Sequence, residues 1–172
     1  GKIFFDVDGV LIDGFHTNPA RQNRWDKTIE QDLGIDPARF QTIFKGWFLD
    51  VLQGRLGFEE ELDRWLAQED YDLKAWQVIE YWHKKDSNLN KDVWGAVQKL
   101  SAIKGVELYT ATNQTHERIH YLRDHLGFGK CFKDFFYSAR LGCLKHDPSY
   151  FANIEEELNF NPRMDSHLYF DD

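Results

Sequence analysis

The chain has 172 residues, of which 42% are apolar, and a formal charge of -8 at pH 7. This length and composition predict one domain, or one domain with an insertion, that buries a substantial hydrophobic core. The acidic charge and the lack of a lysine and arginine cluster exclude a nucleic-acid polymer as partner, and no apolar run is long enough to cross a membrane. The cysteines, Cys131 and Cys143, lack any CxxC or zinc-ligand spacing, which favours a cytoplasmic compartment over a disulfide framework.

An apolar run followed at once by two carboxylates opens the chain. Ile3, Phe4 and Phe5 form the continuous apolar stretch that is typical of a parallel strand covered on both faces. Asp6 and Asp8 then fall at the carboxyl end of that strand, which is the edge where open α/β sheets bind ligands. Because two neighbouring carboxylates supply hard oxygen ligands, this edge is a candidate magnesium site.

The next part of the chain predicts helices and no strand. Charged residues are spread between apolar residues at i, i+3 and i+4 spacing, which indicates amphipathic helices that pack against one another. The expected helices cover residues 21–33, 37–52, 58–67 and 73–83. Together they predict a small helical bundle, residues 15–86, inserted after the first strand.

From about residue 90 the pattern alternates between helix and strand. Such alternation is typical of right-handed βαβ units around a parallel sheet. We therefore expect a doubly wound α/β core, residues 1–14 and 87–172, which the helical bundle interrupts. The expected strands cover residues 106–110, 135–138 and 167–170, and the expected helices are a segment around Val97 and residues 115–126 and 147–158.

Each expected strand is followed by polar side chains of a different kind. The ends of parallel strands lie side by side, so four carboxylates and one ammonium would share one edge of the sheet. They would repel one another unless a divalent cation and an anionic ligand completed the set, and magnesium with a phosphoryl group does so. The side chains are Asp6 and Asp8 after the first strand, Thr112 and Asn113 after the second, Lys145 beyond the third, and Asp171 and Asp172 after the fourth.

The order of these motifs resembles that of the haloacid dehalogenase-like superfamily of hydrolases. The signature of that family is an Asp-x-Asp-Gly motif, a Ser or Thr motif, a downstream lysine and a terminal acidic pair. The resemblance covers the whole chain and implies a Rossmann-like core with a helical cap of the C1 type, as in subfamily I. The matching residues are Asp6-Val7-Asp8-Gly9, Thr112-Asn113, Lys145 and Asp171-Asp172, and His146 stands where the family often has proline.

The resemblance also implies a role for the acidic residues. Asp6 would attack phosphorus and form an aspartyl-phosphate, and Asp8 would act first as general acid and then as general base. Magnesium would be held by Asp6, by the backbone carbonyl of Asp8 and by the terminal pair. In that pair Asp172 is the favoured ligand, and Asp171 would bind directly or through water.

The remaining motif residues would handle the phosphoryl group. Thr112 would donate its hydroxyl to a phosphoryl oxygen, Lys145 would neutralise the transferring charge, and Asn113 would help to orient the anion. Thr110 is a rival to Thr112 for the hydroxyl role, and Thr112 with Asn113 is also compatible with a helix N-cap. An isolated lysine or acidic terminus is ordinarily a solvated surface, so the assignment depends on all four motifs occurring in order.

These roles favour a magnesium-dependent phosphatase that acts on a small phosphorylated metabolite, as a monomer or a homodimer. A sugar phosphomutase of the same superfamily uses the same two aspartates and stays open as an alternative. A non-catalytic module that binds a phospho-ligand stays open as well. Asp8 disfavours a haloacid dehalogenase, since a departing halide needs no proton. The identity of the substrate depends on the shape of the cap and loops, which these motifs do not specify.

Overall fold

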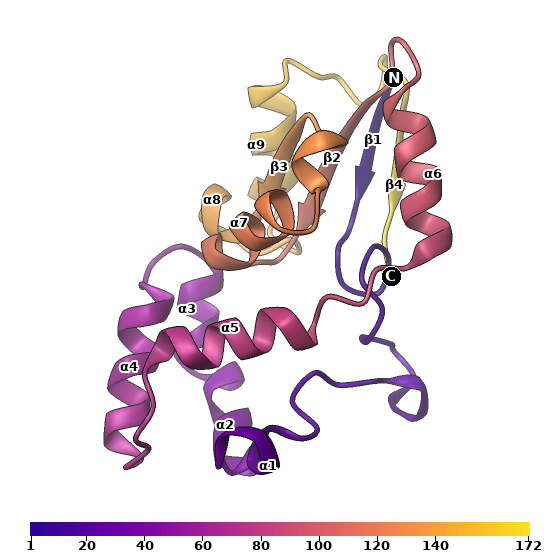
Figure 1. Ribbon diagram of the computed structural model, residues 1–172. Coiled ribbons are helices and arrows are strands. Elements are labelled where there is room, and N and C mark those ends of the chain that lie inside the picture. The colour runs from indigo at the N-terminus through magenta and orange to yellow at the C-terminus, as the bar shows by residue number, and fades with distance from the viewer.

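A computed structural model describes residues 1–172, and a sheet of four parallel strands lies at its centre (Figure 1). The strands are β1 (Lys2–Phe5), β2 (Glu107–Thr112), β3 (Asp134–Tyr137) and β4 (His167–Phe170), in the spatial order β3-β2-β1-β4. Phe5 at the end of β1 is in register with Thr110 of β2 and Phe170 of β4. The carboxyl ends of these strands therefore meet at one edge, and the predicted α/β fold class is confirmed.

Helices cover both faces of this sheet. Helices α6 (Lys91–Ser101) and α7 (His116–Asp124) pack on one face, and α9 (Pro148–Glu157) packs on the other (Figure 1). Successive side chains of a strand point to opposite faces. Accordingly Ile3 and Phe5 lie in the hydrophobic cluster that contains side chains of α6 and α7, whereas Phe4 lies in the cluster that contains side chains of α9. This double burial explains why β1 is apolar throughout.

Side-chain caps fix where the helices around the sheet begin. Asn90, Thr115 and Asp147 precede α6, α7 and α9, and each accepts a hydrogen bond from a backbone N–H of the first turn. Helix α8 (Ser138–Leu141) is one short turn directly after β3, and a 3₁₀ helix, Phe128–Lys130, precedes that strand. Every helix of the protein is too short or too polar to span a bilayer.

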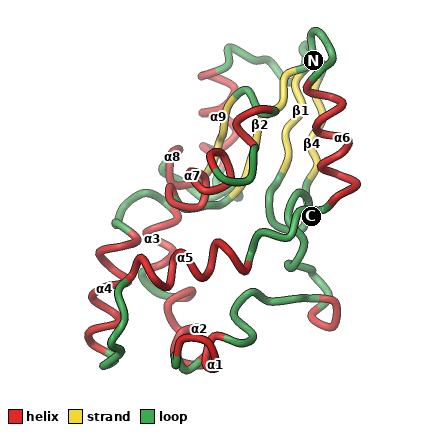
Figure 2. The backbone as a smooth tube through the Cα atoms, viewed as in Figure 1, coloured by secondary structure: helices red, strands yellow, loops and turns green.

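Helices and loops, with no strand among them, make up the helical segment, residues 15–86, between β1 and α6 (Figure 2). Their apolar side chains form a cluster of their own, which includes Phe40, Phe58 and Trp65 and is distinct from the two clusters that flank the sheet. Helices α4 and α5 confirm the predictions for residues 58–67 and 73–83. The elements are α1 (Ile29–Leu33), α2 (Pro37–Gln41), α3 (Phe48–Leu52), α4 (Phe58–Gln68), α5 (Ala75–Lys85) and two 3₁₀ helices, Pro19–Arg21 and Thr42–Lys45.

The helix predicted over residues 21–33 is wrong for most of its length, because only α1 forms there. The ring of Trp25 instead stacks on Trp82, with the centroids 4.4 Å apart and the planes 9° from parallel. Arg24 pairs with the buried carboxylate of Asp26. These contacts depend on the tertiary structure, and they outweigh helix propensity, which is a weak preference.

The helix predicted over residues 37–52 is divided into α2, a 3₁₀ helix and α3. Gly46 separates the last two, at φ -118° and ψ -128°, far from helical values. The division brings the end of α3 against α8. There Gly54, at φ 71°, lies so close to Ala139 that a Cβ atom would collide with the Ala139 carbonyl oxygen. Glycine is therefore required at position 54, where the helical segment contacts the part of the chain that contains the sheet.

Candidate active site

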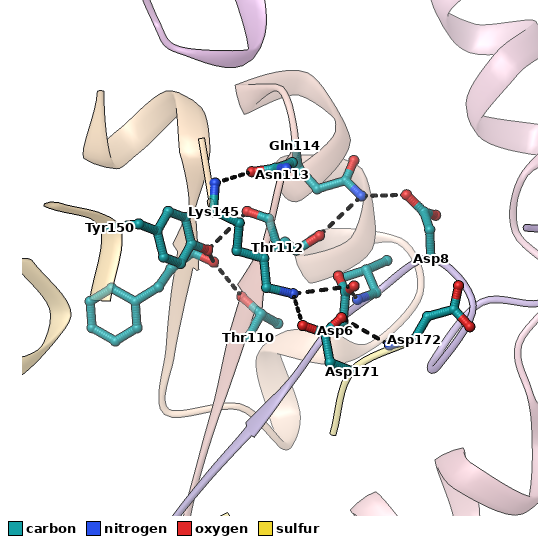
Figure 3. A network of polar contacts seen from close by, with 12 residues as sticks. Asp6, Asp8, Thr110, Thr112, Asn113, Gln114, Lys145, Tyr150, Asp171 and Asp172 are labelled. Atoms are coloured by element: carbon teal, nitrogen blue, oxygen red, sulfur yellow. Dashed lines mark hydrogen bonds and ion pairs between the residues drawn. The ribbon is translucent and has the colours of Figure 1, made fainter. Parts of the chain in front are cut away.

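The predicted site residues gather at the carboxyl edge of the sheet (Figure 3). Asp6 follows β1, and its backbone N–H donates a hydrogen bond of 2.8 Å to the carbonyl of Phe170 in β4. Asp171 therefore comes next to Asp6, directly after β4. Lys145 reaches the same place from the loop between α8 and α9. Segments that are far apart in the sequence thus converge because the strands are parallel and in register.

The ammonium group of Lys145 joins two of these carboxylates. Its Nζ lies 3.2 Å from Oδ2 of Asp6 and 2.9 Å from Oδ2 of Asp171, and only 16% of the lysine side chain is exposed. The backbone N–H of Lys145 donates a hydrogen bond of 2.8 Å to Oδ1 of Asn113. Asn113 therefore positions the loop that carries the lysine, and its predicted contact with an anion stays a prediction.

Burial governs the charge of Asp6. Burial and a hydrogen bond with Asp171 raise the pKa of Asp6 to about 6, although Lys145 and the backbone N–H of Val7 act in the opposite direction. Burial also acts to raise the pKa of Asp171, but its hydrogen bond with Asp6 and the Lys145 ammonium lower that pKa overall. Of the two carboxyl groups, Asp6 therefore binds a proton more readily than Asp171.

Thr112 is the second-strand hydroxyl that faces the site. Its side chain acts to lower the pKa of Asp6, against the stronger effect of burial, and its backbone carbonyl accepts a hydrogen bond of 2.9 Å from the buried hydroxyl of Tyr150. The hydroxyl of Thr110 instead donates to the carbonyl of Phe136 at 3.3 Å, within the sheet. This difference supports Thr112, rather than its rival Thr110, as the residue that could reach a ligand.

Asp8 stands beside this group and is held from the end of the second strand. The Nε2 atom of Gln114 donates hydrogen bonds to Oδ2 of Asp8 at 2.7 Å and to Oγ1 of Thr112 at 3.3 Å (Figure 3). The side chain of Asp8 is 40% exposed, so its carboxyl group borders open space. An oriented and accessible carboxyl group is what proton transfer to a bound molecule requires.

The two residues of the terminal acidic pair have different neighbours. Asp171, rather than the expected Asp172, is the acid that lies beside Asp6 and Lys145. The carboxyl group of Asp172 packs against Gly9, where a Cβ atom would lie 3.0 Å from Asp172 Cγ. Gly9 also has a φ of 83°, so both its backbone conformation and this close approach favour glycine.

The donor set at this edge fits magnesium in its chemistry. Asp6 and Asp171 provide hard carboxylate oxygens, and a divalent cation between them would stabilise the charged form of Asp6 that burial disfavours. No three acidic, histidine or cysteine side chains converge into a complete metal-binding cluster. Further donors would therefore be backbone oxygens, such as the predicted carbonyl of Asp8, or water.

Three polar residues near the site were not among the predicted ones: Gln114, Arg118 and Asp86. Arg118 is 4% exposed, and its Nη2 lies 3.4 Å from Oδ2 of Asp86 and 3.8 Å from Oδ1 of Asp8. Burial raises the pKa of Asp86 to about 6, and Arg118 opposes that shift. The sequence does carry a signal for Arg118, since it precedes Ile119 on the buried stripe of α7, where a charge is unexpected.

A pocket of about 410 Å³ opens between this edge and the helical segment. Its walls are mainly aromatic rings and side-chain amides, and Asp8 is the predicted site residue that lines it. A volume of this size suits a small molecule. The lining residues are Asp8, Gly14, Phe15, Gln22, Asn23, Arg24, Trp25, Gln41, Phe44, Trp82 and Asp86.

Solved structures share this fold. A HAD family enzyme from Bacteroides thetaiotaomicron, crystallised with magnesium, has a TM-score of 0.77 at 16% identity, and the match covers 99% of this chain and 83% of that enzyme. A protein from Porphyromonas gingivalis that is described as a predicted HAD-like family hydrolase has a TM-score of 0.68 at 21% identity, with 98% of this chain and 80% of that protein covered. The L-2-haloacid dehalogenase from Xanthobacter autotrophicus has a TM-score of 0.56 at 17% identity, with 98% and 68% covered.

The sequence itself carries the family assignment. No curated protein matches the chain. A family model described as haloacid dehalogenase-like hydrolase, however, matches residues 3–164, which is nearly the whole length. The matched residues include β2, β3 and most of β1, and they carry Asp6, Asp8, Thr112 and Lys145, whereas β4 and the terminal acidic pair follow the matched range. The chain therefore belongs to the haloacid dehalogenase-like hydrolases.

Proposed function

We propose that this enzyme is a magnesium-dependent phosphatase that hydrolyses a small phosphorylated metabolite through an aspartyl-phosphate on Asp6. The observation that carries the proposal is the Lys145 ammonium, which lies between Asp6 and Asp171. A phosphate dianion that approaches a carboxylate is repelled, and a buried compact cation beside that carboxylate reduces the repulsion. The related Bacteroides thetaiotaomicron enzyme has also been crystallised with magnesium and inorganic phosphate, which supports this reading.

Asp6, Asp171 and the backbone carbonyl of Asp8 would hold the magnesium ion, with Asp172 close by. When bound, the ion would keep Asp6 ionised and withdraw charge from the phosphoryl oxygens. The raised pKa of Asp6 supports this placement, because a cation stabilises the charged carboxylate that burial and the neighbouring Asp171 disfavour.

The chain's own residues divide the reaction into two steps. In the first, an oxygen of Asp6 forms a bond to phosphorus while the bond to the leaving oxygen breaks, and Asp8 gives its proton to that oxygen. In the second, water attacks phosphorus and Asp8 takes its proton, which releases inorganic phosphate and restores Asp6. The Thr112 hydroxyl and the Lys145 ammonium stabilise the charge on the phosphoryl group in both steps.

We assign residues 1–14 and 87–172 to the catalytic core and residues 15–86 to a cap of the C1 type. The separate hydrophobic cluster of the helical segment supports this division. The pocket of about 410 Å³ lies between the two parts and reaches the catalytic edge at Asp8. A leaving group in this pocket would lie next to the residue that protonates it.

The same pocket favours a phosphatase over a sugar phosphomutase. A sugar bisphosphate brings a second anion, and a haloacid brings a carboxylate, so either needs a free cation in the pocket. Arg24 is the basic residue that lines it, and it donates two hydrogen bonds of 2.9 Å to the buried carboxylate of Asp26. Its charge is therefore already neutralised within the protein.

The test is the release of inorganic phosphate from a generic aryl phosphate, with magnesium and then with EDTA. We expect turnover only with the metal, and a loss of about 10⁴-fold or more in Asp6→Asn, which is nearly isosteric. Asp13→Asn is the matched control, since Asp13 is an exposed carboxylate of the same loop. Its activity should stay close to that of the wild type.

Each competing function has a distinct outcome in this experiment. Full activity in EDTA would contradict the metal assignment, and a fully active Asp6→Asn enzyme would exclude the aspartyl-phosphate. A panel of phosphorylated metabolites, sugar bisphosphates included, separates the remaining cases. Isomerisation without phosphate release would indicate a mutase, and metal-dependent binding without turnover would indicate a binding module.

A further inference from the structure

Arg118 is a buried cation whose guanidinium group lacks hydrogen-bond partners at both of its terminal nitrogens. Its side chain is 4% exposed, yet neither Nη1 nor Nη2 donates a hydrogen bond to the protein. Burial of a guanidinium group carries a large desolvation cost unless nearby charges and hydrogen-bond acceptors compensate it. A buried polar group of this kind calls for an explanation beyond packing.

The surroundings of Arg118 exclude direct contact with the body of a substrate. Arg118 borders a cavity of only about 40 Å³, which also touches His83, Gln114 and Thr115. Ligand pockets are roughly ten times larger, and the cavity of about 410 Å³ nearby does not include Arg118 in its walls. Asp8 and Asp86 line both cavities, so they stand between the guanidinium group and the larger pocket.

The two carboxylates that Arg118 faces belong to the two junctions of the helical segment. Asp8 lies in the loop that leads from β1 into this segment, and Asp86 directly follows α5, where the chain returns to the sheet. The guanidinium Nη2 is 3.8 Å from Asp8 and 3.4 Å from Asp86. Arg118 is therefore a cation shared between the loop after β1, which carries Asp8, and the residue that follows α5, Asp86.

Arg118 and Gln114 approach opposite oxygens of the same carboxyl group. Gln114 donates to Oδ2 of Asp8 at 2.7 Å, whereas Arg118 faces Oδ1. Gln114 lies in the turn between β2 and α7, and Arg118 lies four positions later in the first turn of α7. The hydroxyl of Thr115 accepts a hydrogen bond from the backbone N–H of Arg118 and so fixes this turn. A carboxyl group that is held from both sides has little rotational freedom, which is what proton transfer in a fixed direction needs.

We propose that Arg118 is a positioning residue that orients the carboxyl group of Asp8 for proton transfer to the leaving group. Because the same guanidinium group also contacts Asp86, the orientation of Asp8 depends on Asp86 as well. This inference rests on the phosphatase function proposed above. Because Asp86 shares the guanidinium group, Arg118 orients Asp8 without forming an exclusive ion pair with it. The role concerns the leaving oxygen alone, since Asp6 and Lys145 act on phosphorus.

The test compares phosphate monoesters whose leaving groups differ in basicity. A good leaving group such as 4-nitrophenolate departs without a proton, whereas a simple alkoxide requires one. We expect Arg118→Met to lower kcat by about 100-fold for an alkyl phosphate but less than about 5-fold for 4-nitrophenyl phosphate. Arg123→Met is the matched control, because Arg123 lies on the same helix, is exposed and pairs only with Asp124. It should leave both rates unchanged.

Two further variants keep the inference falsifiable if Arg118→Met does not fold. Arg118→Lys keeps the charge and should recover part of the kcat for the alkyl phosphate. Asp86→Asn should lower kcat selectively for the alkyl phosphate, by about 5-fold. Circular dichroism establishes that each variant is folded.

The outcomes separate this inference from the proposed function. An equal loss for all esters would show that Arg118 only maintains the fold, and a rise in KM with unchanged kcat would show that it binds substrate; either result overturns the inference. A wild-type enzyme that hydrolyses no ester in the series overturns the proposed phosphatase function and this inference with it.

Discussion

The sheet edge and the pocket next to it differ in how their charged side chains are paired. At the edge, Lys145 pairs with two carboxylates that would otherwise repel each other. In the pocket, the basic residue Arg24 is bound to a buried aspartate, and much of the wall consists of aromatic rings. The edge therefore presents charge that the proposed function uses on a phosphoryl group, whereas the pocket presents aromatic rings, side-chain amides and an arginine whose charge is already neutralised.

In the proposed function, this difference gives the chemistry and the choice of substrate to separate parts of the chain. Changes at the edge should alter the rate for every substrate alike, because each substrate presents the same phosphoryl group. Changes in the pocket should alter binding and preference and leave the chemical step intact. The predictions below test that separation, and they run from the largest expected effect to the smallest.

The largest effect is expected for Lys145→Met. Removal of the ammonium leaves Asp6 unshielded toward a phosphate dianion, so kcat should fall by about 10²- to 10³-fold for all substrates. Phosphate release from several esters measures the effect. Lys133→Met is the matched control, because Lys133 pairs with Glu107 at the opposite end of β2. A loss confined to one class of substrate would show that Lys145 selects substrates, and it would contradict the separation of the chemical step from substrate choice.

A smaller and different effect is expected for Phe15→Ala. Phe15 lines the pocket and is 53% exposed, so its removal should barely affect folding. The lost apolar contact with a leaving group should raise KM by about 10-fold, with kcat within about 2-fold of the wild-type value. Trp76→Ala is the control, since Trp76 is exposed on α5 outside the pocket. A fall in kcat with unchanged KM would show that the pocket participates in the chemistry.

The smallest effect concerns His83, a buried residue of α5 between the helical segment and the sheet-bearing part. Burial, and to a lesser degree the charge of Arg118, lower the pKa of His83 from 6.5 to about 3. The folded protein therefore keeps His83 neutral, and protons bind preferentially to the unfolded chain. This contribution to stability is complete above pH 6.5 and is lost progressively as the pH falls toward 3.

Acid denaturation of His83→Gln measures this contribution. Between pH 7 and about pH 5.5, the free energy of unfolding of the wild type should decrease by about 1 kcal/mol more than that of the variant. Asp6 and Asp86 have raised pKa values and act in the opposite direction, so the difference between the two proteins is the informative quantity. A constant difference across this pH range would contradict the assignment.

The sheet and its motifs were predictable because they depend on local patterns. β4 covers the predicted residues 167–170, and β1, β2 and β3 begin or end within two residues of the predicted bounds. A continuous apolar run indicates a strand buried on both faces, and parallel pairing then brings the strand ends together without further information. The gathering of Asp6, Thr112, Lys145 and Asp171 follows from that topology.

The helical segment was less predictable because its contacts are not local. Trp25 leaves the helical pattern in order to stack on Trp82, which is 57 positions further along the chain. Apolar spacing indicates that such a residue is buried, but not what it packs against. Asp86 and Arg118 likewise meet only because the end of α5 passes the start of α7, so no motif reveals the pair.

The stacked rings of Trp25 and Trp82 provide an optical signal inside the pocket wall. Two indoles whose centroids are 4.4 Å apart are close enough to couple their excited states, so we expect the pair to contribute to circular dichroism and fluorescence. Both rings line the cavity of about 410 Å³, so a molecule that enters it changes their environment directly. Ligand titrations can therefore be followed spectroscopically in the unlabelled protein, with no need for turnover.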